Sequence, residues 1–209
     1  NFIDNRSIVI DSTEALNLPI VPERMLIVGG GYIGLEIGTV YSSLGSRVTI
    51  VEVKDGLLPG VDRDLVRPLQ EKLNKEFETV RLNTEIVSIR ESGKSGYVTM
   101  ATAEETIEES FDRILVSVGR RPNTDKIGLE HTKVELDDKG FVKVDFKRQT
   151  SDSAILAIGD VSGEPMLAHK ASHEARIGID GLDGKDVAFD NRVIPAVVFT
   201  DPEIAWCGL

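Results

Sequence analysis

The stretch RMLIVGGGYIGLE, residues 24–36, decides the fold. Its first five residues form a short apolar run that predicts a buried strand, and three glycines end that strand abruptly. Apolar residues at helical spacing follow over 33–44, and Gly45 marks the end of the helix. A second apolar run, 48–53, predicts the next strand. A strand, glycine turn, helix and strand in this order make a βαβ unit, whose parallel strands need a crossover helix.

Gly29, Gly31 and Gly34 have the GxGxxG spacing that is typical of dinucleotide-binding turns. The first glycine permits the tight turn, the second lets a pyrophosphate approach the backbone, and the third allows helix and strand to pack closely. Unpaired N–H groups at the helix start would face the anion, so the local field outweighs the chain's net charge of −11. The spacing alone is a weak signal, because a purely structural turn can share it.

Glu52 ends the second predicted strand, at about the 20-residue distance from the glycine turn that a dinucleotide fold requires. A carboxylate there can accept hydrogen bonds from both ribose hydroxyls of an adenosine and repels a 2′-phosphate, which favours NAD over NADP. The alternative interpretation is a polar residue at a strand end, and the nearby Lys54 makes the preference less sharp.

Further along the chain, β-rich runs over 86–89, 97–102 and 113–118 predict a β-meander inserted after the βαβ units. The Glu-rich stretch 104–109 between them predicts a solvated turn.

Four more elements are expected outside the meander. Helical spacing predicts a helix over 62–77, with Asp62 as its N-cap, and a second helix over 167–179. Apolar runs predict a buried strand over 154–158 and another strand over 193–199.

Composition excludes several classes of protein. Twenty-four Lys and Arg against 35 Asp and Glu, without a basic cluster, argue against a nucleic-acid partner. No apolar run reaches the roughly 18 residues needed to cross a bilayer and no signal peptide opens the sequence, so a soluble, cytoplasmic protein is expected. One cysteine, Cys207, and three histidines predict neither a metal site nor thiol catalysis within this chain.

Six motifs in register resemble the flavoprotein disulfide reductases, and most closely the dihydrolipoyl dehydrogenases of that family. The motifs are GGGYIGLE (29–36), LGSRVTIVE (44–52), SVGRRPNT (117–124), AILAIGDV (154–161), MLAHKA (166–171) and VVFTDPEIAWCG (197–208). Any one of them is modest support, whereas their shared order covers nearly the whole chain.

The resemblance implies where NAD would bind. Eight consecutive residues would hold its pyrophosphate, with the last of them reaching toward the nicotinamide end: Gly29, Gly30, Gly31, Tyr32, Ile33, Gly34, Leu35 and Glu36. Glu52 would take the adenosine ribose, the backbone at Ile86 would lie by the adenine, and Gly119 would close over the nicotinamide side.

The resemblance also implies contacts with FAD. Asp160 would accept a hydrogen bond from the flavin ribityl chain or its adjoining hydroxyl. Four residues would lie along the isoalloxazine, where a helix start stabilises negative charge on a reduced flavin: Met166, Leu167, Ala168 and His169. The alternative interpretations are a simple Gly-Asp turn at Asp160, a surface histidine at His169 and solvated charges at Arg120 and Arg121.

In this family, oxidation of dihydrolipoamide on a lipoyl domain passes electrons through a cysteine pair to the flavin, and a hydride then passes to NAD. The family's acid and base are a His-Glu pair from the other subunit of a homodimer. The chain contains neither the cysteine pair nor that C-terminal region, so no catalytic residue is expected within it.

The expected architecture is therefore the central segment of a longer FAD- and NAD-dependent oxidoreductase. A Rossmann-like NAD-binding domain with a parallel sheet and a β-meander would occupy 23–146, with partial FAD-domain segments at 1–22 and 147–190 and the start of a dimer-interface domain at 191–209. Alone, the segment is expected to bind NAD weakly and FAD hardly at all.

Three alternatives stay open. A soluble pyridine-nucleotide transhydrogenase shares the nucleotide domains and lacks the cysteine pair. Glutathione and mercuric reductases are relatives that use NADP, and Glu52 argues against them. A non-catalytic NAD sensor is the third, but it would not need the flavin-side motifs at 154–161 and 166–171. The residues MLAHKA of the motif at 166–171 favour the dehydrogenases.

Overall fold

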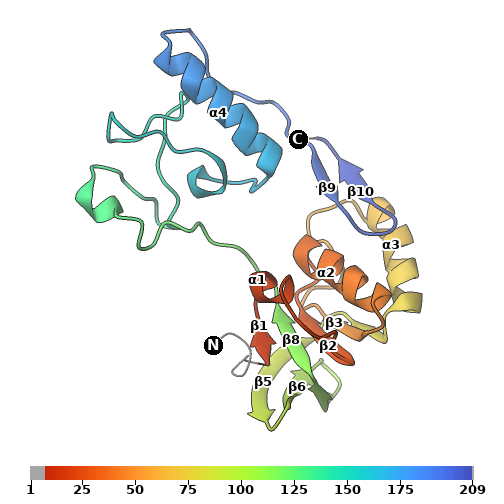
Figure 1. The fold of residues 1–209 in the computed structure, drawn as a ribbon. Coiled ribbons are helices and arrows are strands. Elements are labelled where there is room, and N and C mark those ends of the chain that lie inside the picture. The colour runs from red at the N-terminus through yellow and green to blue at the C-terminus, as the bar shows by residue number, and fades with distance from the viewer. Residues whose placement is uncertain (1–7, 209) are drawn as a thin grey trace. The chain divides into compact units, whose positions relative to one another are not determined.

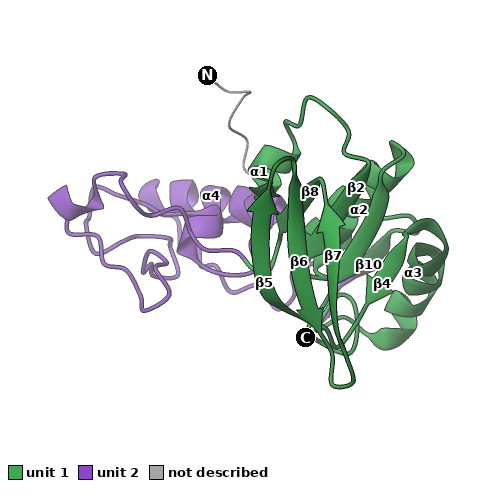
Figure 2. Cartoon of the chain, turned by 90° about the horizontal axis from the view of Figure 1, so that it is seen from below, with its two compact units in different colours: residues 1–119, 197–205 green, residues 120–196, 206–209 purple. Residues whose placement is uncertain are grey.

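The computed structural model describes residues 8–208 and confirms the predicted mixed α/β fold (Figure 1). The chain divides into two compact units, coloured separately in Figure 2: unit 1 comprises residues 1–119 and 197–205, and unit 2 comprises 120–196 and 206–209. The domain limits expected from the sequence do not coincide with this division and stay a prediction. Residues 1–7 of the first expected FAD-domain segment, and Leu209, lie outside the described residues.

The described part of unit 1 contains a five-stranded sheet, a three-stranded sheet and three helices, and most of a two-stranded sheet over 196–206 also belongs to it. The strands of the first sheet are β1 (Val9–Ile10), β2 (Arg24–Val28), β3 (Arg47–Val51), β4 (Thr79–Arg81) and β8 (Arg113–Val116). The strands of the second are β5 (Glu85–Ser92), β6 (Ser95–Ala101) and β7 (Thr106–Phe111). The helices are α1 (Ser12–Ala15), α2 (Tyr32–Ser43) and α3 (Arg63–Glu76). The first sheet is parallel, in the order β1-β8-β2-β3-β4, and the second is antiparallel, in the order β5-β6-β7.

Strand β2 is buried on both faces, which explains its unbroken apolar sequence. Successive side chains of a strand point to opposite faces. Ile27 lies against α2, so close that a Cβ on Gly38 would be 2.7 Å from its side chain. Leu26 points the other way, into a core cluster with Val98 and Phe111 of the antiparallel sheet. The parallel sheet therefore lies between a helix layer and the meander, as continuous apolar strands require.

The predicted strand over 113–118 is real, but its assignment to the meander was wrong. Observed as β8, it pairs with β1 and β2 in the parallel sheet. The third meander strand is instead β7, which includes much of the Glu-rich stretch 104–109 that was predicted as a solvated turn. Apolar periodicity identifies a strand, but it does not identify the strand's partner.

Glu109 explains why β7 was missed. It shares the inward face of β7 with Ile107 and Phe111, where an apolar residue would be expected. Its carboxylate accepts hydrogen bonds from Arg24 at 2.9 Å and Arg81 at 2.7 Å. Burial raises the pKa of Glu109, but these hydrogen bonds outweigh that effect and hold it below its usual value.

The helix predicted over 62–77 is confirmed as α3. Asp62 occupies the N-cap position, although its side chain makes no capping hydrogen bond. Leu69 and Leu73 are fully buried as the apolar spacing predicts, but Leu65, the first residue of that spacing, is 38% exposed, and Val66 is buried instead.

Unit 2 has little regular structure apart from one long helix. Its helical elements are η1 (Leu129–His131), η2 (Gly159–Ser162) and α4 (Ala168–Leu182), the last confirming the helix predicted from residue 167. The strand predicted over 154–158 was wrong, because that segment makes only an isolated bridge, between Leu156 and Gln149. The strand predicted over 193–199 is shorter, β9 (Ala196–Val198), and pairs with β10 (Ile204–Trp206).

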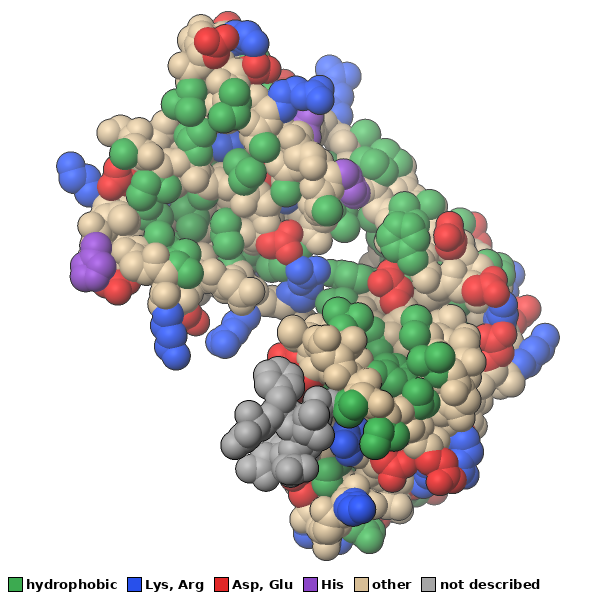
Figure 3. Space-filling model, in the orientation of Figure 1, with side chains coloured by type: hydrophobic (Ala, Val, Ile, Leu, Met, Phe, Trp, Pro, Cys, Tyr) green, Lys and Arg blue, Asp and Glu red, His purple; other side chains and the backbone are tan. Residues whose placement is uncertain are grey.

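Basic and acidic side chains are interspersed on the face shown in Figure 3. Several are paired. In unit 1, Lys72 of α3 pairs with Asp201 of the returning segment 197–205. In unit 2, Lys185 pairs with Asp180 at 2.6 Å. Among the described residues, no helix has the length and apolar character needed to cross a membrane.

Candidate nucleotide-binding site

Gly29 and Gly34, the first and third glycines of the GxGxxG spacing, are required by the fold itself. Gly29 has φ 111°, a backbone conformation that favours glycine, and a Cβ there would lie 2.7 Å from the Ser117 carbonyl oxygen. At Gly34 a Cβ would lie 2.4 Å from the Gly29 carbonyl oxygen. The turn and the close approach of α2 to the sheet therefore explain both residues.

Gly31 differs, because nothing in the described structure requires a glycine there. Its φ of −81° suits any residue, and a Cβ would meet no atom within 4 Å. It is the N-cap of α2 and makes no side-chain capping bond, and Tyr32 and Ile33 follow in the first turn. A side chain at this position would extend into open space at the N-terminus of α2, and a helix N-terminus favours anions.

Glu52 lies directly beside the turn. Its Oε2 accepts a hydrogen bond from the Gly30 amide at 2.7 Å, and its Oε1 accepts one from the Lys54 amide at 2.9 Å. The side chain is only 7% exposed. Each carboxylate oxygen keeps a further lone pair that a ribose hydroxyl could use. Glu52 is thus more than a polar strand end: it fastens the glycine turn to the end of β3.

Leu35 and Glu36 complete the first predicted set. Leu35 is fully buried, so its side chain belongs to the core and only its backbone could serve a ligand. The Glu36 Oε1 accepts a hydrogen bond from the Phe199 amide at 2.9 Å, within unit 1. Sequence reasoning did not predict this link between α2 and the returning segment, because no local pattern relates the two.

Ile86 and Gly119 are the two remaining residues predicted to contact NAD. The Thr84 amide donates to the Glu52 carbonyl at 3.0 Å, which holds the start of β5 near Glu52. Ile86 itself packs its side chain against the core cluster. Gly119 has φ 149° and open space around its Cβ position.

Ser117 was missed as a site residue. Its Oγ donates to the Val28 carbonyl at 3.1 Å and lies 2.8 Å from the Cβ position of Gly34. It therefore supports the glycine turn from β8. Its signal in the sequence is its place as the first residue of the motif SVGRRPNT, directly after β8.

The residues predicted to contact FAD lie in unit 2. Asp160 is in η2, and its Oδ2 accepts a hydrogen bond from the Arg120 guanidinium at 2.6 Å. Arg120 is therefore paired rather than simply solvated. Met166 and Leu167 precede α4 and Ala168 begins it. His169 donates from Nε2 to the Pro195 carbonyl at 2.7 Å, because a carbonyl can only accept.

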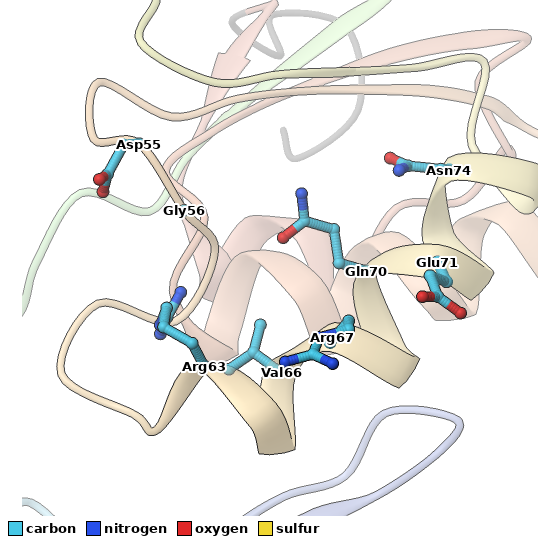
Figure 4. A pocket seen from close by; sticks show the side chains of 8 residues that line it. All are labelled: Asp55, Gly56, Arg63, Val66, Arg67, Gln70, Glu71 and Asn74. Atoms are coloured by element: carbon cyan, nitrogen blue, oxygen red, sulfur yellow. The ribbon is translucent and has the colours of Figure 1, made fainter.

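A polar pocket of about 300 Å³ lies between α3 and the loop at 55–56 (Figure 4). None of the predicted site residues lines it. Arg63, one of its residues, donates to the carbonyls of Leu57 and Leu58 and so stabilises the loop. Among the described residues, no group of His, Cys, Asp and Glu side chains is arranged to hold a metal ion.

Comparisons with known proteins identify the family of the chain. The chain is 45% identical to the dihydrolipoyl dehydrogenase of Buchnera aphidicola subsp. Schizaphis graminum, over 99% of its own length and 43% of the relative's. It is 43% identical to the dihydrolipoyl dehydrogenase of Vibrio parahaemolyticus, over 95% of its own length and 42% of the relative's. The chain thus spans less than half the length of these curated relatives.

Solved structures show the same likeness. The HOCl-induced flavoprotein disulfide reductase RclA from Escherichia coli superimposes with a TM-score of 0.85 at 29% identity, covering 96% of this chain and 46% of that one. LpdA from Mycobacterium tuberculosis superimposes with a TM-score of 0.78 at 32% identity, covering 90% and 40%. Residues 4–175 match the family described as pyridine nucleotide-disulphide oxidoreductase, and the chain belongs to that family.

Proposed function

We propose that the chain is the NAD-binding central part of a dihydrolipoyl dehydrogenase, a flavoenzyme that oxidises protein-bound dihydrolipoamide with NAD as hydride acceptor. The curated relatives bear this name, which favours it over the transhydrogenase and sensor alternatives. On this proposal 23–146 is the NAD-binding domain, 1–22 and 147–190 belong to an FAD domain, and 191–209 begins an interface domain.

The single observation that carries the NAD part is the contrast between Gly31 and its two neighbouring fingerprint glycines. Gly29 and Gly34 serve the fold, whereas the space at Gly31 fits an approaching pyrophosphate. The first-turn amides of α2 would donate to its oxygens. Glu52 would accept hydrogen bonds from the adenosine ribose and repel a 2′-phosphate.

Unit 2 would supply contacts to FAD, which provides the redox chemistry when bound. The Asp160 carboxylate, 41% exposed, can accept a hydrogen bond from a flavin hydroxyl in addition to that from Arg120. Met166, Leu167 and Ala168 lead into α4, whose N-terminus favours negative charge. His169 contributes backbone, because its ring is already bonded to Pro195.

The proposal includes partners that lie outside this chain. The dithiol substrate would be a lipoyl group on a 2-oxo acid dehydrogenase complex, and the whole enzyme would be a cytoplasmic homodimer. Reading the coding sequence on either side of the chain tests this part: a CxxxxC motif after a first GxGxxG upstream supports it, and a sequence without them opposes it.

Titration of the chain with NADH and NADPH, followed by the change in nicotinamide fluorescence, tests the nucleotide preference directly. We expect NADH to bind at least about tenfold more tightly than NADPH, since the 2′-phosphate would meet the Glu52 carboxylate. Glu52→Gln should reduce this ratio. Glu105→Gln, the same chemical change in the exposed β6–β7 loop, is the matched control. Equal affinities for the two nucleotides in the wild type would count against the proposal.

A further inference from the structure

Three charged side chains are buried together in unit 2, beneath the turn that begins η2. Arg148 is 8% exposed, Lys170 2% and Glu174 not at all. Lys170 and Glu174 are four residues apart on α4 and so lie on one face of the helix. None of the three is among the residues proposed to contact NAD or FAD.

This cluster binds both backbone polar groups of Gly159, the amide of the 158–159 peptide and the carbonyl of the 159–160 peptide. The Gly159 amide donates to Glu174 Oε2 at 2.6 Å. Its carbonyl accepts from Lys170 Nζ at 3.1 Å and from the Ser162 hydroxyl at 3.0 Å. Lys170 also donates to the Gly163 carbonyl at 2.9 Å, so a single ammonium joins the start of η2 to the residue after it.

Arg148 completes the cluster from a separate loop. Its Nη1 donates to Glu174 Oε1 at 2.9 Å, and its Nη2 donates to the Asp145 carbonyl. The guanidinium lies over the Phe189 ring, 4.5 Å from the centroid. Two cations thus share one carboxylate, which leaves one positive charge in excess beneath the turn.

Outside η2 itself, little regular structure supports the turn. The segment before it, 154–158, makes only one isolated β-bridge. Gly159 has φ 75°, and a Cβ there would lie 3.1 Å from the Ala171 Cβ, so the turn is pressed against α4. Buried ion pairs stabilise a fold less than apolar packing of similar volume. A role in geometry is the better explanation for this network.

We propose that Arg148, Lys170 and Glu174 are positioning residues, which fix the Gly159 peptide and thereby aim the Asp160 carboxylate at the flavin. The proposal rests on the proposed function, since it takes Asp160 as a flavin contact. Asp160 is the next residue along the chain, so the direction of its side chain follows from the orientation of that peptide. The hydrogen bond that the Asp160 carboxylate accepts from Arg120 restrains the same side chain from its other end.

The test uses the full-length flavoprotein in which the chain is proposed to lie, together with amide hydrogen exchange on the chain itself. Lys170→Met keeps the length of the side chain but removes its donors to both carbonyls. Lys170→Arg keeps charge and donors. Lys185→Met is the control, because it removes a lysine from an exposed ion pair with Asp180, which lies on the same helix as Lys170.

We expect Lys170→Met to speed exchange at the Gly159 and Asp160 amides and to weaken FAD binding, each about tenfold, the cost of one charge-assisted hydrogen bond. The visible flavin spectrum should change and the flavin midpoint potential should fall, because a buried positive charge is lost. Lys170→Arg should restore most of these properties, and Lys185→Met should alter none of them. Ser162→Ala removes a donor to the same carbonyl without unpairing a buried charge, so it gives the smaller change in the same direction if Lys170→Met does not fold.

The outcomes separate the two levels of inference. A wild-type protein that binds no FAD refutes the proposed function, and the positioning role falls with it. A wild type that binds FAD, with Lys170→Met and Ser162→Ala that keep its affinity, spectrum and potential, refutes the positioning role alone. Faster amide exchange at Gly159 and Asp160, with unchanged FAD affinity, spectrum and potential, also refutes the positioning role, because the network would then stabilise the turn without affecting the flavin.

Discussion

Alanine substitutions at Gly31 and Gly34 should separate ligand access from folding. The two glycines are three residues apart in one fingerprint, yet a Cβ at Gly31 meets nothing within 4 Å, whereas a Cβ at Gly34 would lie 2.4 Å from a backbone oxygen. Backbone cannot move aside as a flexible side chain can. The same chemical change should therefore destabilise the fold at Gly34 but not at Gly31.

For Gly34→Ala we expect a loss of stability of about 3 kcal/mol, the upper end of the range for overpacking, because Ser117 Oγ and Ile27 Cγ2 would also lie within 3 Å of the new methyl group. In a domain of this size that corresponds to a fall in Tm of about 10 °C. NADH affinity would also fall, as a consequence of the distorted turn.

For Gly31→Ala we expect stability to stay within about 1 kcal/mol of the wild type. The gain from a less flexible unfolded chain is opposed by the poorer N-cap. NADH affinity should nevertheless fall at least about tenfold, because the methyl group occupies the space that the pyrophosphate needs.

Thermal unfolding and NADH titration on the same preparations measure both effects. The reasoning would be refuted by a Gly31→Ala variant that binds NADH as the wild type does, since open space would then not mean ligand space. It would also fail if Gly34→Ala retained the wild-type Tm.

Two further predictions concern Glu52 and Glu109, two carboxylates of unit 1. Glu52→Gln should lower Tm as well as nucleotide discrimination, because the Glu52 carboxylate accepts from the Gly30 amide; an unchanged Tm would show that the turn does not need this bond. The pKa of Glu109 lies below its usual value, so its contribution to stability is present above about pH 4.3 and is lost as pH falls through the lowered pKa. Glu109→Gln should therefore unfold at a lower temperature than the wild type at neutral pH, and the gap should narrow at about pH 3. A gap that stays constant between these pH values would contradict this account.

Local patterns predicted the βαβ unit of unit 1 correctly. The run before Gly29, the helix that follows it and Glu52 at the end of β3 are all local signals, and their contacts in space follow from the βαβ geometry. Such features can be read from a single stretch of sequence because neighbouring residues determine them.

Features that depend on distant partners could not be predicted in the same way. Glu109 reads as solvent-exposed until Arg24 and Arg81 are known to meet it. The run 154–158 reads as a strand, but a strand also needs a neighbour, and the described structure gives it one bridge only. The bond from Glu36 to Phe199 joins segments that share no motif.

The position of β8 has a consequence for how this chain is made. It lies between β1 and β2, pairing residue 114 with residue 9 and residue 113 with residue 25. During translation, the first two strands therefore leave the ribosome without the neighbour that separates them, and the whole meander is synthesised before that neighbour arrives. Closure of the sheet waits for contacts of long sequence separation, which are slow to form. Until then the facing edges of β1 and β2 have unpaired N–H and C=O groups, which can pair with a strand of another chain.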